Sequence, residues 1–382
     1  MRLPMTTEED VLHEKEIPVR ASEPCVLVIF GATGDLTGRK LMPAIYKLYA
    51  EEMAPEGFTI VGFARREWSD EDFRSKMLED MKKAKCPIDD AKWKTFSEKL
   101  FYHRSEFDSD EGYDTLKKRL EEMDQKMGTK GNRLFYLATQ PSFFTTITAK
   151  LKERGLVYDP TDESKYSRVI IEKPFGTDLD SALALQHEIS QHFSEDQIFR
   201  IDHYLAKETV QNLLAFRFAN SLFESLWNYK HIDRVVITVA EDIGVGTRGK
   251  FFEEAGLMRD IVQNHVMQLL SLVAMESPVS LGASCIHDEK VKVLRSIRPM
   301  TEEEVDEHTV RGQYGAGYEK GEQMKGYREE DNVDPHSKIE TYTAVRLFID
   351  NWRWAGVPFY LRAGKRLAEK TTEIAVFFQD AP

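Results

Sequence analysis

Short apolar runs alternate with amphipathic helical patterns over the first half of the chain. The apolar runs predict buried strands, at residues 25–30, 58–63, 133–137 and 168–171. The helical patterns lie between or after these runs, at residues 41–48, 69–83, 89–100, 113–126 and 142–154. Because strands that alternate with helices form a parallel sheet covered on both faces, we predict an α/β domain with a doubly wound parallel sheet over residues 21–200. Residues 1–20 are predicted to form a flexible arm.

The pattern changes after residue 200. Further strands are predicted at residues 231–240, 342–349, 358–361 and 373–378. Further helices are predicted at residues 205–219, 256–275 and 288–297. This order favours an α+β domain over residues 201–382, with a large and mostly antiparallel sheet. Residues 301–340 carry 12 acidic and 5 basic residues together with several glycines, which is typical of a solvated loop.

Length and composition exclude several classes of protein. A chain of 382 residues is too long for a single ordinary domain, so more than one hydrophobic core is expected. The net charge of −13 argues against a broad nucleic-acid-binding face. Three scattered cysteines, Cys25, Cys86 and Cys285, fit free thiols in the cytoplasm better than a disulfide framework. No stretch is long and apolar enough for a membrane helix, and the first 20 residues are too charged for a signal peptide.

A glycine turn follows the first predicted strand and opens the first helix. Gly31 and Gly34 stand where the backbone can approach a ligand closely and where free helix N–H groups stabilise phosphate, so a dinucleotide site is predicted. A tight turn without any ligand is the alternative. A phosphate-loop NTPase is disfavoured, because Lys40 is followed by Leu41 and no Lys-Ser or Lys-Thr pair comes after the turn.

Two arginines follow the second predicted strand. Arg65 and Arg66 stand where NAD-binding proteins carry a carboxylate for the ribose 2′-hydroxyl. Guanidinium groups suit a 2′-phosphate, so NADP is favoured over NAD as the cofactor. Solvated surface arginines are the alternative interpretation.

Several longer motifs carry a family resemblance. They are Gly31 to Leu36, the Glu-Lys-Pro-Phe-Gly run at 172–176, the Arg-Ile-Asp-His-Tyr-Leu-Ala-Lys-Glu run at 200–208, and shorter runs at 259–265 and 361–365. In this order they closely resemble the glucose-6-phosphate dehydrogenase family, with Ala206 where that family mostly has glycine. The resemblance implies a Rossmann domain joined to an α+β domain, and oxidation of glucose 6-phosphate at C1 to the lactone with reduction of NADP, the first step of the oxidative pentose phosphate pathway.

The resemblance also carries expectations about chain length and assembly. Family chains continue well beyond the position of Pro382, so we expect a sheet short of strands and a dimer surface that lacks a part. A homodimer or homotetramer is expected of the full-length form.

Removing hydride from C1 leaves a hydroxyl proton that a base must accept, and neutral imidazole suits this task near neutral pH. The resemblance nominates His265 as this base and Asp202 as the carboxylate that orients its ring. It assigns Glu241 and Asp260 to the sugar hydroxyls.

For the substrate phosphate, the resemblance points to His203, Tyr204 and Lys207 in one segment, completed by Lys365 and Lys370, with the substrate in a cleft between domains. Lys173 would bridge nicotinamide and sugar, with a cis peptide bond before Pro174. The predicted cofactor-binding residues are Gly31, Thr33, Gly34, Asp35, Leu36, Arg65 and Lys173.

Other readings stay open. A dehydrogenase of the glucose-fructose oxidoreductase type also carries Glu-Lys-Pro after a strand but acts on unphosphorylated sugars, and an inactive NADP-binding module is a third possibility. No metal site is predicted, because His187 and His192 lie five residues apart and not the four of a zincin helix.

Overall fold

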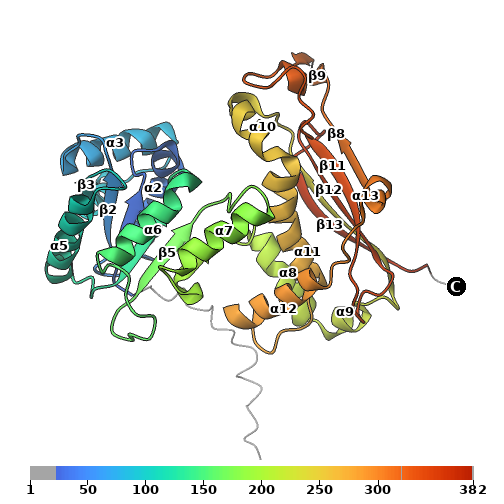
Figure 1. Cartoon of the computed structure of the whole chain (residues 1–382), viewed down its shortest axis with the longest axis horizontal. Helices are drawn as coiled ribbons and strands as arrows, with labels where there is room; N and C mark the ends of the chain where they lie inside the picture. The colour runs from blue at the N-terminus through green and yellow to red at the C-terminus, as the bar shows by residue number, and fades with distance from the viewer. Residues whose placement is uncertain (1–22, 320, 381–382) are drawn as a thin grey trace, which may run out of the picture. The chain divides into compact units, whose positions relative to one another are not determined.

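The computed structural model of the chain describes residues 23–319 and 321–380, so the predicted arm over residues 1–20 lies outside the described part. The chain divides into two compact units, with the boundary between Ile201 and Asp202. Figure 1 shows a sheet flanked by helices in the first unit and a second sheet with long helices in the second.

The first unit is built on a six-stranded parallel sheet in the order β3-β2-β1-β4-β5-β6. The strands are β1 (Val26–Phe30), β2 (Thr59–Ala64), β3 (Leu100–Arg104), β4 (Arg133–Leu137), β5 (Ser167–Ile171) and β6 (Ile198–Arg200). This order confirms the predicted doubly wound sheet. Two strands were not predicted: β6 is three residues long, and β3 begins at Leu100, where the sequence pattern continues a helix.

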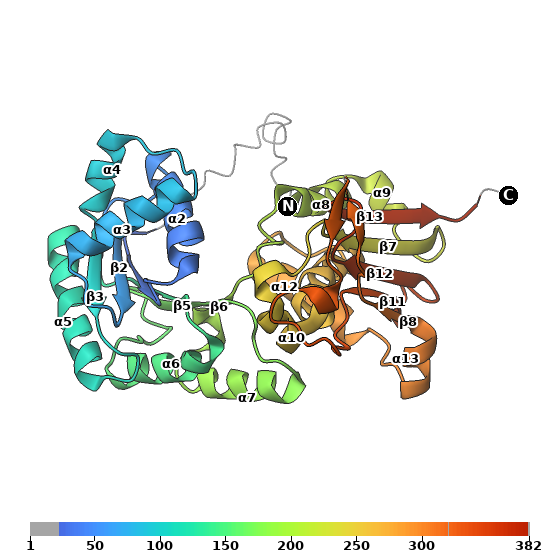
Figure 2. The same ribbon diagram turned by 90° about the horizontal axis from the view of Figure 1, so that it is seen from above.

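Helices cover both faces of this sheet, as Figure 2 shows. One face packs against α2 (Met42–Ala50), α3 (Asp70–Lys83) and α4 (Asp90–Ser97). The other packs against α5 (Asp110–Met127), α6 (Phe144–Glu153) and α7 (Leu179–Ser190). Capping boxes at Ser69 and Asp178 begin α3 and α7, because each side chain accepts a hydrogen bond from a free N–H of the first turn.

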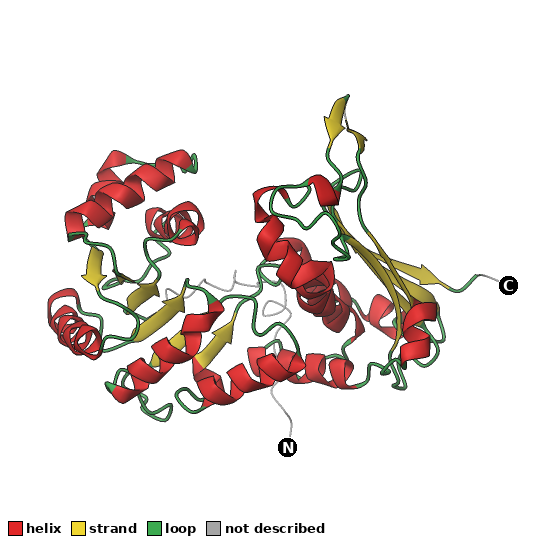
Figure 3. Cartoon of the chain, turned by 45° about the horizontal axis from the view of Figure 1, so that its top comes forward, coloured by secondary structure: helices red, strands yellow, loops and turns green. Residues whose placement is uncertain are grey.

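The second unit contains a five-stranded sheet in the order β13-β7-β12-β11-β8. The strands are β7 (Ile232–Ala240), β8 (Thr309–Gly312), β11 (Tyr342–Phe348), β12 (Pro358–Gly364) and β13 (Thr371–Phe378). Only the β7–β12 pair is parallel, so the predicted mostly antiparallel sheet is confirmed. One hydrophobic core joins this sheet to its helices, and Figure 3 shows those helices gathered along it.

The helices of the second unit are α8 (Glu208–Phe218), α9 (Ser221–Leu226), α10 (Gly249–Leu257), α11 (Met267–Ala274), α12 (Ala283–Arg295) and α13 (Glu302–His308). The predicted helix over 256–275 corresponds to the π-helical segment η5 (Met258–Val266) and α11, which follow one another without a gap to Ala274, whereas the helix α10 before it was not predicted. Gly256, with a φ of +66°, makes a kink near the end of α10, just before η5 begins. Single turns of 3-10 helix complete the described elements, at η2 (Pro141–Phe143), η3 (Glu195–Gln197), η4 (Gly246–Arg248) and η6 (Tyr327–Glu329), with a further π-helical segment at η1 (Thr37–Leu41).

The prediction of a solvated loop over residues 301–340 was wrong. This segment contains α13, the strand β8 that pairs with β11, and a hairpin of β9 (Gly317–Glu319) and β10 (Glu322–Met324). It also buries Tyr327 completely against the helix α10 through Phe252. Acidic composition misled the prediction of a loop: most of these carboxylates are exposed, but they stand on helices and strands, and Glu330 and Glu340 are half-buried and accept hydrogen bonds inside the unit.

Candidate active site

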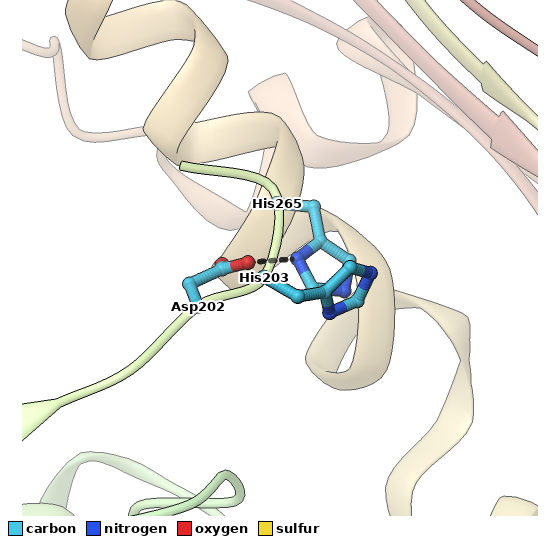
Figure 4. Close-up of side chains that lie close together, drawn as sticks. All are labelled: Asp202, His203 and His265. Carbon is cyan, nitrogen blue, oxygen red and sulfur yellow. Dashed lines mark hydrogen bonds and ion pairs between the residues drawn. The ribbon is translucent and has the colours of Figure 1, made fainter. Parts of the chain in front are cut away.

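A histidine and a carboxylate from distant parts of the second unit meet in the core. His265 lies on η5, and Asp202 lies 63 residues earlier, just before α8. The distance from Nδ1 of His265 to Oδ1 of Asp202 is 2.7 Å, and Figure 4 shows the two side chains joined. The carboxylate accepts this hydrogen bond, so Nδ1 carries the proton and Nε2 keeps its lone pair. The pair is thus arranged as a general base with an orienting carboxylate.

The ionisation of Asp202 follows from its contacts. Burial alone would raise the pKa of this carboxyl, but the hydrogen bonds from His265 and from the N–H of Tyr204 outweigh burial and hold the pKa below its usual value. Asp202 is therefore an anion near neutral pH. An anion in this position can stabilise the imidazolium that forms when His265 takes up a proton.

Two aromatic rings enclose the His265 imidazole. Tyr204 is buried and stacks on it, with ring centroids 4.1 Å apart and planes 16° apart. His203 is exposed and meets it edge-on, with centroids 4.5 Å apart. His203 stands beside the dyad in Figure 4. His265 itself is 1% exposed, so its ring has little freedom to turn away from Asp202.

Asp260 lies five residues before His265 on η5 and is also buried. A π-helix brings residues five apart onto one face, because its hydrogen bonds join position i to position i+5. The unusual helical turn therefore presents Asp260 and His265 on the same side. Such π-helical insertions are frequent at functional sites.

Lys207 and Lys370, two lysines of the second unit, repel each other electrostatically. Lys207 lies just before α8, half-buried, with its Nζ 3.4 Å from the centroid of the Tyr204 ring. Burial and then the positive charge of Lys370 lower the pKa of Lys207. Lys370 is exposed and lies between β12 and β13. Like charges this close favour an anion between or beside them, which suits a phosphate.

Lys365 is placed differently from the other lysines. Its side chain is fully buried and pairs with Glu241. The pairing follows from strand register: β7 and β12 are parallel neighbours with Ala240 beside Gly364, so the next residue of each strand reaches the same sheet end. The Glu241 N–H also donates to the carbonyl oxygen of Gly364, at 2.9 Å. Two predicted substrate residues thus meet each other directly.

In the first unit the glycine turn joins β1 to η1. Gly31 has a φ of +84°, and a Cβ there would lie 2.4 Å from the carbonyl oxygen of Ala138, so only glycine fits. A Cβ on Gly34 would meet the Gly31 carbonyl oxygen at 3.1 Å. Thr33 and Leu36 are half-buried, and Asp35 is exposed and bonded to Arg39 at 3.1 Å. This close-packed turn before a helix suits a dinucleotide pyrophosphate.

Two further predicted residues lie at strand ends of the first unit. Arg65 is exposed and directly follows β2. Lys173 is half-buried and follows β5 after Glu172, which accepts a hydrogen bond from the Tyr136 hydroxyl at 2.6 Å. The Lys173–Pro174 peptide bond is cis, which confirms that prediction. Both residues lie at carboxyl ends of parallel strands, where ligands bind in doubly wound folds.

Two residues near the site were not predicted from the sequence. Lys290 on α12 is half-buried; burial lowers its pKa, and the charge of Asp202 opposes that shift. Glu340, from the acidic segment, accepts the N–H of Met258 at 2.9 Å and so caps the start of η5. Both depend on tertiary packing between segments far apart in sequence, which no local motif records.

Metal ligation and membrane spans were also considered. Among residues 23–319 and 321–380, the one group of three side chains suited to a metal ion is Asp202, His203 and His265, whose ligand atoms lie within 4.8 Å of one another. These are the residues of the dyad and its neighbour. His187 and His192 belong to no such group in the described chain. No helix of the described part is long and apolar enough to cross a membrane.

Comparison with known proteins shows which family the chain belongs to. Residues 28–212 match the family described as glucose-6-phosphate dehydrogenase, NAD binding domain, and residues 214–382 match its C-terminal domain. The glucose-6-phosphate 1-dehydrogenases of Chlamydia pneumoniae and Bacillus subtilis are 53% and 48% identical over 95% and 94% of this chain, which spans 71% of each relative.

Solved structures are similar as well. A glucose-6-phosphate dehydrogenase in complex with its substrate glucose 6-phosphate is 42% identical, with a TM-score of 0.86 over 94% of this chain and 72% of the other. The Mycobacterium avium enzyme is 38% identical, with a TM-score of 0.81 over 94% of this chain and 74% of the other. On both family matches and on these relatives, the chain belongs to the glucose-6-phosphate dehydrogenase family.

Proposed function

We propose that this chain carries out the reaction of its family with NADP as cofactor: oxidation of D-glucose 6-phosphate at C1 to 6-phospho-D-glucono-1,5-lactone, the first step of the oxidative pentose phosphate pathway. The observation that carries the assignment of the base is the buried Asp202–His265 pair, at 2.7 Å. A hydroxyl at C1 cannot become a carbonyl unless its proton is removed as the hydride departs, and this pair supplies an oriented acceptor.

His265 takes the C1 hydroxyl proton on Nε2, and the electron pair of that O–H bond becomes the second bond of the lactone carbonyl. The C1–H bond breaks at the same centre, and the chemistry that bound NADP would supply is acceptance of this hydride. Asp202 stays ionised and stabilises the imidazolium through Nδ1. The buried Tyr204 ring keeps the imidazole in register by stacking on it.

The substrate phosphate is a dianion and needs cations. Lys207, Lys370 and the exposed His203 would bind it, supported by the depressed pKa of Lys207 beside Lys370. Glu241 and Asp260 would accept hydrogen bonds from sugar hydroxyls, with Lys365 holding Glu241 in place and donating to the substrate. Lys173 is proposed to bridge sugar and nicotinamide, an assignment that rests on its place at the end of β5 and on the resemblance.

The cofactor is proposed to bind on the turn of Gly31, Thr33, Gly34, Asp35 and Leu36, with Arg65 on the 2′-phosphate. The close fit of Gly31 against Ala138 supports this, because a side chain there would clash with the Ala138 carbonyl and force the turn out of its shape. Charge reversal in Arg65→Glu should raise the KM for NADP by about tenfold or more while changing the KM for NAD by less than about twofold. Equal changes for both cofactors would remove Arg65 from the site.

The proposal is tested on the purified chain by following reduced nicotinamide absorbance with glucose 6-phosphate and with glucose. We expect turnover with the phosphorylated sugar, and a loss of about a thousandfold or more in His265→Asn, since general base and orienting effects are removed together. Equal activity with glucose would favour the glucose-fructose oxidoreductase type. Cofactor binding without any lactone would favour an inactive NADP-binding module.

Assembly and location are further proposals. A homodimer or homotetramer is proposed from the resemblance, and light scattering of the purified chain would measure it. A cytoplasmic location is proposed from Cys25, Cys86 and Cys285, all of which are free thiols.

A further inference from the structure

A buried carboxylate lies in the middle of the acidic segment. The Glu330 side chain is 9% exposed, although it stands in a run rich in solvated acids. A carboxylate is costly to bury unless hydrogen bonds or cations compensate it. The contacts of Glu330 therefore indicate what the burial achieves.

Glu330 is held by two side chains from other parts of the second unit. Its Oε1 accepts a hydrogen bond from the Tyr314 hydroxyl at 3.0 Å and lies 3.5 Å from Nη2 of Arg366. The Tyr314 oxygen in turn accepts the backbone N–H of Val245 at 3.1 Å. We call Tyr314, Glu330 and Arg366 the Glu330 cradle.

The loop that follows β7 rests on this cradle. A Cβ on Gly244 would lie 2.6 Å from Oε1 of Glu330 and 2.9 Å from both the Tyr314 hydroxyl and Nε of Arg366. Only a residue without a side chain can approach the three groups this closely. The polar groups of the Glu330 cradle therefore hold the backbone of the loop in place, in addition to apolar packing.

The same loop is bonded to the segment that follows β12. The N–H of Arg366 donates to the Ile243 carbonyl at 3.2 Å, and the N–H of Leu367 donates to the Glu241 carbonyl at 3.0 Å. Glu241 is the first residue of the segment after β7, and Lys365 is the first residue of the segment after β12. The cradle therefore contacts both of the segments that carry the buried Glu241–Lys365 pair.

We propose that Glu330 is a positioning residue for glucose 6-phosphate: through Tyr314 and Arg366 it holds the loop of Glu241 against the segment of Lys365, and so sets the geometry of that pair. The proposal rests on the proposed function of Glu241 and Lys365 in substrate binding. The charge of Glu330 also pairs with the Arg366 guanidinium, one residue after Lys365.

The test compares Glu330→Gln and Tyr314→Phe with a control, Glu322→Gln, which changes an exposed acid on β10 of the same segment. For each cradle variant we expect the KM for glucose 6-phosphate to rise about tenfold, as for the loss of one charge-assisted hydrogen bond. We expect kcat and the KM for NADP to stay within about twofold, because the dyad and the glycine turn are untouched. Tyr314→Phe keeps the ring and removes a single hydroxyl, so it tests the positioning role even if Glu330→Gln folds poorly.

A double variant sharpens the result. If Glu330 acts through Tyr314, the two substitutions together should raise the KM little more than either alone, whereas independent effects would multiply. Unchanged KM in both single variants would overturn the proposal. So would a parallel loss of kcat, of NADP affinity and of thermal midpoint, since that pattern reports general destabilisation.

Lys365→Ala separates this proposal from the one beneath it. If Lys365→Ala raises the KM for glucose 6-phosphate but the cradle variants do not, the positioning role is wrong and the proposed substrate site stands. If Lys365→Ala leaves that KM unchanged, the substrate-binding role of the pair itself is wrong.

Discussion

Replacing Asp202 by Asn probes the dyad with the smallest change of shape. The amide keeps the volume of the carboxylate and can still accept from Nδ1 of His265, but it carries no charge. A general base acts from its neutral form, so the lost charge matters little before proton transfer. In the transition state the imidazole gains a proton, and the anion that stabilises it is missing.

The geometry sets the size of the effect. The bonded atoms are 2.7 Å apart, which places the centres of the two charges roughly 4 Å apart. The Asp202 side chain is 12% exposed and that of His265 is 2% exposed, so solvent screening is weak. At an effective dielectric constant of about 20, such a pair is stabilised by about 4 kcal/mol, which corresponds to a roughly thousandfold fall in kcat.

The assay is the initial rate of nicotinamide reduction with glucose 6-phosphate. The KM values should change little, because Asp202 is proposed to contact neither substrate nor cofactor. Asp288→Asn, which neutralises an exposed carboxylate on α12, is the matched control. In a double variant with His265→Asn, the Asp202 substitution should cost nothing further. A fall in kcat of less than about tenfold would refute the role given to Asp202, since it would mean that the charge does not stabilise the transition state.

Three other outcomes are expected. Lys207→Ala and Lys370→Ala should each raise the KM for glucose 6-phosphate about tenfold, and added salt should weaken binding in the parent more than in either variant; identical salt dependence would argue against a phosphate clamp. Arg217 is fully buried, donates to the carbonyl oxygens of Leu272 and Met275, and pairs with Glu224 at 3.1 Å. Arg217→Ala should therefore destabilise the second unit by about 3 to 5 kcal/mol, seen as a thermal midpoint about 10 °C lower; a midpoint within about 2 °C would contradict this. Burial lowers the pKa of His103, so the unfolded chain binds a proton first as pH falls, and stability should decline from about pH 6.5 downward. In His103→Gln, urea midpoints between about pH 7.5 and 5 should fall less steeply than in the parent, and an equal slope would exclude this histidine.

The periodicity of hydrophobic residues was sufficient to predict helices and strands that have clear boundaries. The buried runs of β1 and β2 and the capped helix α3 follow directly from local pattern, because every residue of the strands is buried and Ser69 marks the start of the helix. The strand β3 was missed, since only two residues separate it from the end of α4 and it ends in His103 and Arg104. A pattern that changes period without a glycine or proline between gives no boundary to detect.

The site depended on information that local pattern does not hold. The pairing of Asp202 with His265 was predicted through family resemblance, because nothing in a spacing of 63 residues indicates contact. Lys365 was grouped with the phosphate lysines, whereas the parallel pairing of β7 with β12 seats it against Glu241. Acid-rich composition likewise concealed Glu330, since composition cannot distinguish a solvated carboxylate from one enclosed by Tyr314.

Transfer of the C1 hydrogen gives the most direct test of the proposed reaction. Glucose 6-phosphate deuterated at C1 is incubated with the purified chain and NADP, and the mass of the reduced cofactor is measured. One deuterium in the reduced nicotinamide, with lactone or its hydrolysis product lacking that deuterium, is the predicted result. Reduced cofactor without the label, or a sugar that keeps its C1 deuterium while nicotinamide is reduced, would contradict it.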